Sequence, residues 1–190
     1  MNRFNILLLA ILFAISCTAQ KKNRAKNNLK NSTTTETFTS TKPDTKIGSK
    51  IPTFGVLKAD LNLTFDTYLD KNKSLVLVLF NPSCGHCEQL ITNVRDSSYL
   101  FKNVEFLFVT GKELIEYVPD FAERLKVKNH ELITISSDQS DLTQKLFEYN
   151  GIPQIMIYNK EKLLQKILFK EATMQQLLDA LQTKNIEQKK

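Results

Sequence analysis

The stretch that decides the fold runs from an apolar segment into two cysteines and reads Leu75-Val76-Leu77-Val78-Leu79-Phe80-Asn81-Pro82-Ser83-Cys84-Gly85-His86-Cys87. A short unbroken apolar run that ends in a turn is typical of a strand buried on both faces. Beyond the turn, apolar residues recur with the period of an amphipathic helix over about 84–96, at Cys87, Leu90, Ile91 and Val94. We therefore expect a buried strand, a turn, and a helix that begins at two thiols.

Two cysteines at this spacing in the first turn of a helix have a specific chemistry. Free backbone N–H groups and the positive end of the helix dipole favour the thiolate of Cys84 over its thiol. Cys87 lies one turn further on, close enough to form a disulfide with Cys84. Cys84 can then attack the disulfide of a partner, and Cys87 can resolve the mixed disulfide. His86, as an imidazolium, would stabilise the thiolate further and make the couple more oxidising.

A metal or haem site fits these cysteines less well. A structural zinc site needs four ligands, and outside the motif the chain has only Cys17 and His130 to offer as Cys or His ligands. Covalent haem attachment needs a histidine directly after the second cysteine, where this chain has Glu88. We therefore expect no metal and no cofactor other than the redox-active disulfide between Cys84 and Cys87.

The motif resembles the active site of the thioredoxin superfamily, and its Cys-Gly-His-Cys tetrapeptide, with Gly85 and His86 as the redox-tuning residues, is the one found in protein disulfide isomerases. A second likeness is Gly151-Ile152-Pro153-Gln154, which precedes an apolar segment. In thioredoxins this loop carries a cis-proline beside the two cysteines. The resemblance implies that Ile152 and Pro153 bind the backbone of a client protein. An ordinary trans proline after a helix-ending glycine is the alternative for Pro153.

Further apolar segments predict the remaining elements. Strands are expected as a leading strand or hairpin within 51–63, at 104–109, at 132–135, and as a hairpin of 154–158 with 163–169. Helices are expected at 65–69, 113–125, 141–149 and 173–181. Pro119 should kink or restart the second of these helices. Strands separated by helices indicate an α/β sheet with helices on both faces.

The resemblance covers about residues 48–183, which we interpret as a thioredoxin-like domain. The stretch from Gly48 to Phe54 is similar to the start of the membrane-tethered, periplasmic thiol reductases of the TlpA-like branch. The order of elements matches the thioredoxin fold with the strand–helix insertion of that branch. The resemblance therefore implies a central mixed sheet with helices on both faces.

Four positions bear on how far the resemblance extends. Val78 stands where thioredoxins carry a buried acid, which accepts the proton of the resolving cysteine, and Ser83 stands where they carry tryptophan. Glu88 is a candidate to replace that acid, with an exposed helix residue as the alternative. Gln154 follows Pro153 where many relatives have threonine, and we expect this difference to alter the substrate groove.

Residues 1–19 have the composition of a secretory leader. Arg3 precedes an apolar run that ends at Ile15 and is short for a membrane span. The sequence Ala14-Ile15-Ser16-Cys17 resembles a bacterial lipoprotein box, which makes Cys17 the candidate for lipidation. Cleavage after Ala19, with loss of Cys17, is the alternative. Both predict export to the bacterial periplasm or cell envelope, where disulfide chemistry is possible.

The charge of the chain is concentrated in its first quarter. Residues 1–50 carry nine Lys or Arg and two acidic residues, whereas residues 51–190 carry 17 basic and 18 acidic residues. Residues 20–47 are expected to form a disordered, basic tether, and residues 184–190 a polar tail. A basic tether beside a lipid anchor suits the anionic headgroups of a membrane. The domain itself lacks the basic excess that nucleic-acid binding needs.

Together these features favour an exported enzyme, a thiol–disulfide oxidoreductase with reductase or isomerase-type activity. Its expected partners are client proteins with disulfides or thiols and a thiol electron donor, either in the membrane or soluble. The alternative is a catalytically weak, thioredoxin-like binding or adaptor module, because a fold does not fix a function. A thiol peroxidase is less favoured, since Pro82-Ser83-Cys84 does not supply the Pro-x-x-x-Thr-x-x-Cys pattern of such enzymes.

Overall fold

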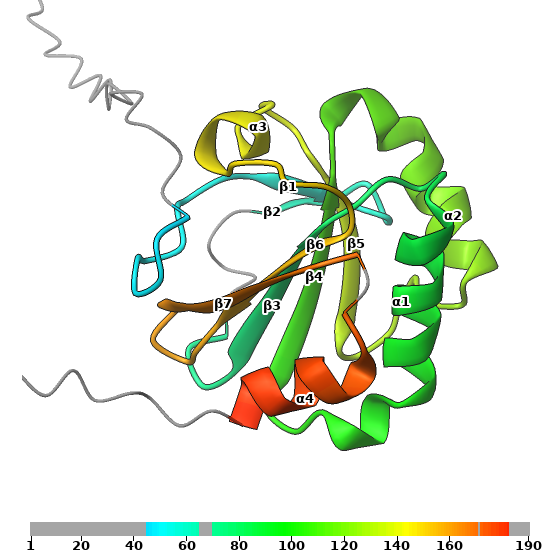
Figure 1. Cartoon of the computed structure of the whole chain (residues 1–190). Helices are drawn as coiled ribbons and strands as arrows, with labels where there is room; N and C mark the ends of the chain where they lie inside the picture. The colour runs from blue at the N-terminus through cyan, green and yellow to red at the C-terminus, as the bar shows by residue number, and fades with distance from the viewer. Residues whose placement is uncertain (1–44, 65–69, 171, 183–190) are drawn as a thin grey trace, which may run out of the picture. The chain divides into compact units, whose positions relative to one another are not determined.

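A seven-stranded mixed sheet dominates the computed structural model, which describes residues 45–64, 70–170 and 172–182 (Figure 1). The strands lie in the order β2-β1-β5-β4-β3-β6-β7. Their bounds are β1 Val56–Lys58, β2 Leu63–Thr64, β3 Ser74–Leu79, β4 Val104–Thr110, β5 Ile133–Asp138, β6 Gln154–Tyr158 and β7 Leu164–Phe169. The helices are α1 Gly85–Asp96, α2 Val118–Arg124, α3 Thr143–Leu146 and α4 Met174–Gln182, with 3-10 helices at Ser98–Leu100 and Lys112–Tyr117.

Strand β3 lies at the centre of the fold, parallel to β4 and antiparallel to β6. Successive side chains of a strand point to opposite faces of its sheet. Val76 and Val78 therefore pack into the core on one face, while Leu75, Leu77 and Leu79 pack into the core on the other. Burial on both faces is the reason that this segment is apolar throughout.

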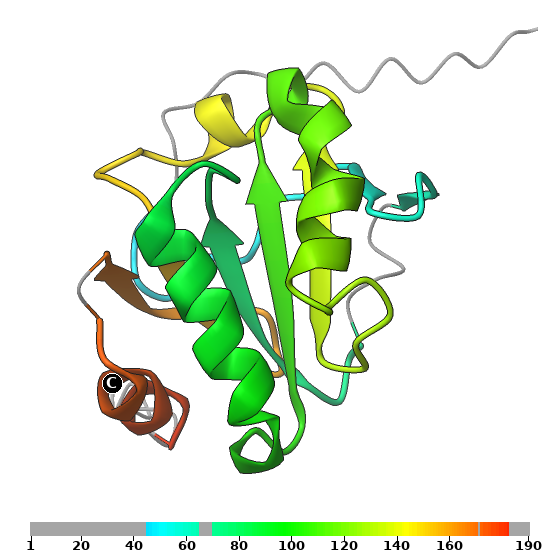
Figure 2. The same ribbon diagram turned by 90° about the vertical axis from the view of Figure 1, so that its right-hand side faces the viewer.

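The two faces of the sheet are covered differently. Helices α1, α2 and α4 bury Ile91, Phe121 and Leu177 against one face, and Figure 2 shows α1 and α2 lying across it. On the other face α3 and the chain before β1 contribute Leu146 and Phe54. The predicted mixed sheet with helices on both faces is confirmed, with a single helical turn on the second face. None of the described helices has the length and apolar content to cross a membrane.

The segment 141–149 contains only one helical turn, α3, in place of the predicted helix. The carboxylate of Asp138 accepts hydrogen bonds from the backbone N–H and the hydroxyl of Thr143, at 2.6 and 2.9 Å, and so starts the turn. Phe147 then adopts an extended conformation and buries its ring against Phe54, with 6.0 Å between the ring centroids. Burial of this ring outweighs continuation of the helix.

Other predicted elements are present with changed bounds. The segment 51–63 contains the hairpin of β1 and β2, with Val56 opposite Thr64. Strand β5 extends beyond its predicted end through the buried polar residues Ser136, Ser137 and Asp138. The hydroxyl of Ser136 donates to the carbonyl of Phe108 at 2.8 Å, whereas the buried hydroxyl of Ser137 has no hydrogen-bond partner among the described residues. The predicted helix at 113–125 is a 3-10 helix followed by α2, which restarts with Pro119 in its first turn.

Several predictions fall outside the described residues. They are the leader at 1–19 with Cys17, the tether up to residue 44, the helix at 65–69 and the polar tail at 184–190.

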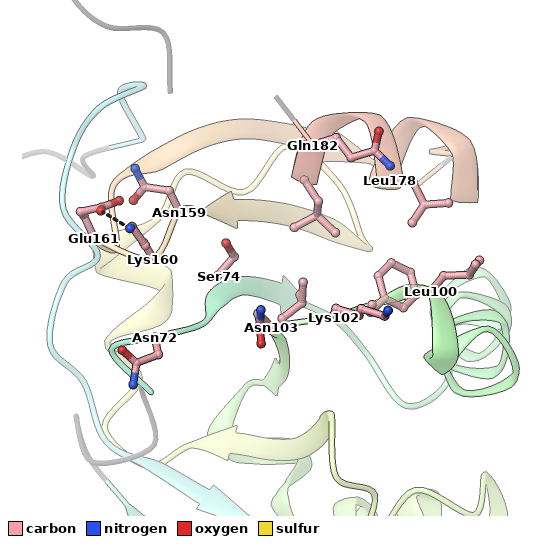
Figure 3. A pocket seen from close by; sticks show the side chains of 13 residues that line it. Asn72, Ser74, Leu100, Lys102, Asn103, Asn159, Lys160, Glu161, Leu178 and Gln182 are labelled. Atoms are coloured by element: carbon pink, nitrogen blue, oxygen red, sulfur yellow. Dashed lines mark ion pairs between the residues drawn. The ribbon is translucent and has the colours of Figure 1, made fainter. Parts of the chain in front are cut away.

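The two ends of the described domain lie at the same end of the sheet, where β3 and β4 begin. The N–H of Gly48 donates to the carbonyl of Leu164 at 2.7 Å, and the N–H of Leu164 donates to Ser49 at 2.8 Å. The leading segment therefore pairs with the start of β7. Gln182, the last residue of α4, lines one pocket together with Ser74, the first residue of β3 (Figure 3).

The central position of β3 gives a stability prediction. Replacing the fully buried side chain in Leu77→Ala should lower the free energy of unfolding by about 2–5 kcal/mol, because apolar contacts are lost and a cavity remains. The matched variant Leu100→Ala, at a side chain that is 45% exposed, should cost less than about 1 kcal/mol. Urea unfolding followed by circular dichroism measures both, and equal losses would contradict the assigned core.

Candidate active site

The turn after β3 is shaped by Asn81. Its side-chain carbonyl accepts the N–H of Ser83 at 2.8 Å, and its backbone carbonyl accepts the N–H of Cys84 at 3.0 Å. Cys84 becomes the N-cap of α1 with extended dihedrals of −92° and 114°, and its carbonyl accepts the N–H of Glu88. The first sulfur is therefore carried at the open end of the helix, where backbone N–H groups have no partners within the helix.

The two sulfurs of the motif differ sharply in environment. Both cysteines are free thiols in the structure, with Cys84 partly exposed and Cys87 fully buried on the side of α1 that packs into the core. Burial raises the pKa of Cys87 to about 12; the neighbouring Cys84 thiol adds to this rise, and the backbone of Asn81 opposes it. Val78, where thioredoxins carry an acid, is itself buried. Cys87 is thus held as a protonated thiol, whereas the sulfur of Cys84 is accessible from solvent.

The predicted loop 151–154 lies beside the turn that carries Cys84. Because β6 runs antiparallel to β3 with Gln154 opposite Leu79, the residues before β6 lie beside the turn after β3. The carbonyl oxygen of Ile152 is 4.0 Å from the sulfur of Cys84. Pro153 is buried, and its peptide bond with Ile152 is cis. The structure therefore brings Cys84, Ile152 and Pro153 together, and the client-binding role of Ile152 and Pro153 stays a prediction.

The two residues between the cysteines are both exposed. The His86 side chain lines a groove of about 350 Å³ together with Pro153 and Lys170, between α1 and the chain that leads into α4. Gly85 is the first residue of α1, and a Cβ atom at this position would meet open space. The local fold therefore does not require glycine here, and the redox-tuning role of Gly85 and His86 stays a prediction.

The position of Glu88 argues against its role as a proton acceptor. Its carboxylate accepts a hydrogen bond from Arg124 at 2.6 Å, and both side chains are about half exposed. The guanidinium of Arg124 lies 5.3 Å from the centroid of the Phe121 ring. Glu88 thus forms a surface ion pair across α1 and α2, and it is not among the groups that shift the pKa of Cys87.

Gln154 does not contact the groove directly, and its effect on the substrate groove stays a prediction. Its side chain is fully buried and binds the backbone of the preceding loop, so it does not line the groove beside His86. The signal in the sequence was a polar residue at the first position of an otherwise apolar strand. Such a residue must find hydrogen-bond partners when it is buried, and the nearest backbone groups that lack a strand partner belong to the loop before it.

The described residues contain no other cluster with comparable chemistry. No group of three or more His, Cys, Asp or Glu among them could hold a metal ion. A pocket of about 490 Å³ lies at the opposite end of the sheet and is lined by Ser74 and Leu178, and also by Lys160, which pairs with Glu161 at 3.7 Å (Figure 3). No thiol or imidazole lines this pocket.

Comparison with known proteins bears on the fold. No family model and no curated protein matches the chain. The thioredoxin domain of the thiol-disulfide oxidoreductase BVU-2223 from Bacteroides vulgatus superposes with a TM-score of 0.56 at 17% identity, covering 70% of this chain and 94% of that one. The chain has a thioredoxin-like fold. StoA from Bacillus subtilis is similar at a TM-score of 0.55 and 16% identity, covering 70% of this thioredoxin-like chain and 98% of StoA. A peroxiredoxin-like protein from Aquifex aeolicus superposes with a TM-score of 0.58 at 15% identity, covering 72% of this chain and 86% of that one.

The difference between the two sulfurs predicts selective alkylation. In a Cys17→Ser background, iodoacetamide at pH 8 should modify Cys84 in the reduced, folded protein and leave Cys87 unmodified, because Cys87 is buried and protonated. Mass spectrometry after digestion identifies the labelled residue. The double variant with Cys84→Ser should take up label only after unfolding in urea. Labelling of Cys87 as fast as Cys84 in the folded protein would contradict the structure.

The raised pKa of Cys87 also predicts how stability depends on pH. Its pKa rises from 9.0 to about 12 on folding. Between these values the unfolded chain has lost a proton that the folded chain retains, so the free energy of unfolding falls as pH increases. This contribution is fully present below pH 9 and is lost as pH approaches 12.

The test compares wild type with Cys87→Ala, both reduced, by urea unfolding at pH 8 to 11. The wild type should lose stability more steeply, by a slope that corresponds to one proton. Parallel curves would mean that Cys87 titrates as it does in the unfolded chain.

Proposed function

We propose that this chain is an exported thiol–disulfide oxidoreductase of the thioredoxin superfamily, close to the TlpA-like branch, which exchanges disulfides with client proteins through Cys84 and Cys87. The observation that carries the proposal is the geometry of three groups. An accessible sulfur caps a helix, a buried sulfur lies one turn behind it, and the carbonyl of Ile152 lies 4.0 Å from the first. The Cys-Gly-His-Cys tetrapeptide adds the chemistry of protein disulfide isomerases by resemblance.

Each step of the reduction follows from this geometry. The thiolate of Cys84 attacks one sulfur of a client disulfide; the client S–S bond breaks, a mixed disulfide forms, and the other client sulfur leaves as a thiolate that takes up a proton. Cys87 then gives its proton to solvent, and its thiolate attacks the sulfur of Cys84. The mixed disulfide breaks, and the second client sulfur leaves as a thiolate that takes up a proton. The client gains two electrons and the Cys84–Cys87 pair becomes a disulfide. A thiol donor, membrane-bound or soluble, must reduce this pair for the next cycle.

The residues around the sulfurs have supporting roles in this proposal. Ile152 and Pro153 bind the client backbone, because any polypeptide whose disulfide reaches Cys84 must pass the carbonyl beside it. His86 tunes the redox potential of the couple. The protein acts in the periplasm or cell envelope, held to a membrane by a lipid on Cys17 and the basic tether. No cofactor beyond the cysteine pair takes part, and no nucleic acid is bound.

One observation favours the second candidate, a thioredoxin-like adaptor with weak turnover. Cys87 must lose its proton to resolve a mixed disulfide, yet its pKa is raised to about 12 and the nearby Val78 offers no base. A slow second step would leave clients bound to Cys84 and make the protein a binding module.

Insulin reduction by dithiothreitol separates the two candidates. The wild type should accelerate precipitation of the insulin B chain, and Cys84→Ser should return the rate to that of dithiothreitol alone, because the attacking sulfur is gone. Cys87→Ser should accumulate a mixed disulfide with insulin, visible on a non-reducing gel. A wild type that does not exceed the blank, but is retained on immobilised insulin with intact disulfides and released from it by dithiothreitol, would exclude the enzyme and support the adaptor.

A further inference from the structure

The Gln154 side chain ties the loop beside Cys84 to the sheet. Its Nε2 donates to the carbonyl of Glu148 at 2.9 Å, and its Oε1 accepts the N–H of Asn150 at 2.9 Å. These two partners fix the orientation of the amide, because a carbonyl only accepts and a backbone N–H only donates. The residue is 0% exposed, so neither bond competes with bulk water. Gln154 therefore connects the loop directly to the core.

The side chain is itself firmly held. Gln154 is the first residue of β6, with its backbone paired to Leu79 of β3 on one side and to Phe169 of β7 on the other. Its Nε2 also lies 3.9 Å from the sulfur of Met156 on the same strand. The amide is thus a rigid extension of the sheet, and the loop backbone folds around it.

The loop that it holds is the one that meets a client. Phe147 anchors the start of the loop in the core, and from there the chain runs past both partners of Gln154 to Ile152. Gly151 reverses the chain at a φ of +119°, a value that favours glycine. The carbonyl of Ile152, next in the chain, lies 4.0 Å from the sulfur of Cys84. A shift of the loop would therefore move the backbone group beside the reacting sulfur.

We propose that Gln154 is a positioning residue for client binding: its buried amide, bonded to Glu148 and Asn150, holds the Ile152 carbonyl where the backbone of a client polypeptide reaches it. This inference rests on the proposed function and adds to it a specificity for polypeptide disulfides. A disulfide without a peptide backbone needs only Cys84, and so does not depend on Gln154.

The requirement for an amide is chemical. Glutamine offers a donor and an acceptor on one planar group, which matches a C=O and an N–H two residues apart in the loop. Glutamate keeps the acceptor for Asn150 but loses the donor for Glu148. Methionine keeps approximately the length and volume of the side chain but offers neither donor nor a strong acceptor. These two substitutions therefore separate hydrogen bonding from packing.

The experiment measures two substrates on the full chain, in the wild type and in Gln154→Met and Gln154→Glu. All variants carry Cys17→Ser. Steady-state reduction of insulin reports on a polypeptide client, and the first thiolate released from 5,5′-dithiobis(2-nitrobenzoate) in single turnovers of the reduced protein reports on Cys84. Gln154→Met should raise the KM for insulin at least about tenfold and leave the rate with the small disulfide within about twofold. Gln154→Glu should show a smaller rise in KM.

A matched control separates positioning from loss of stability. Ser136→Ala removes another buried hydrogen bond to a backbone carbonyl, from the hydroxyl of Ser136 to Phe108, on a strand that β4 and β3 separate from β6. With urea midpoints measured for all variants, Ser136→Ala should leave both substrates within about twofold of the wild type. If it raised the KM for insulin as Gln154→Met does, general destabilisation would replace positioning as the explanation.

The remaining outcomes are distinct. An unchanged KM for insulin in folded Gln154→Met, or an equal loss with both substrates, would overturn the inference while the proposed function stands. If Gln154→Met does not fold, Gln154→Glu decides by the same comparison of substrates. A wild type that reduces neither substrate would overturn the proposed function, and the inference with it.

Discussion

The antiparallel pairing of β3 with β6 is the constraint on which the site depends. Leu79 lies opposite Gln154, so the turn that carries Cys84 and the loop that ends at Pro153 leave the sheet side by side, although 69 positions separate these two residues in the chain. A slip of one residue would move every side chain of a strand to the other face. Such a slip would move Gln154 away from its hydrogen-bond partners and into an apolar layer, which is unfavourable. Because both faces of the sheet are buried, the register is fixed, and with it the distance between Cys84 and Ile152.

The start of α1 explains how two chemically identical side chains acquire opposite properties. The helix seats Cys84 before its first turn, where backbone donors are open and solvent has access. The same turn then directs Cys87 into the core against the sheet. Asn81 contributes to both environments, since its carbonyl holds the backbone of Cys84 and its backbone lies against the Cys87 thiol. A single turn therefore supplies an accessible nucleophile and a protected partner, and no Asp, Glu, His, Lys or Arg side chain is among the groups that shift the pKa of Cys87.

The sequence predicted the parts of the fold where one force dominates. The unbroken apolar run of β3 and the helical period from Cys87 to Val94 located the sheet centre and α1, and the resemblance placed Pro153 beside them. Segments where local and distant forces compete were less predictable. Phe147 ends α3 early because a contact distant in sequence outweighs the helix, and Gln154 is buried because loop atoms satisfy it. Local periodicity shows neither the ring contact of Phe147 nor the hydrogen bonds of Gln154, because both depend on the tertiary arrangement of the chain around the sheet.

The leading segment that pairs with Leu164 and the last turn of α4 both lie at the end of the sheet remote from Cys84. A fusion partner, a fluorescent label or a solid support joined through either terminus of this domain is therefore directed away from the reactive end. Attachment through either end thus leaves the end of the sheet with Cys84 facing away from the attachment point, where large polypeptides can reach it.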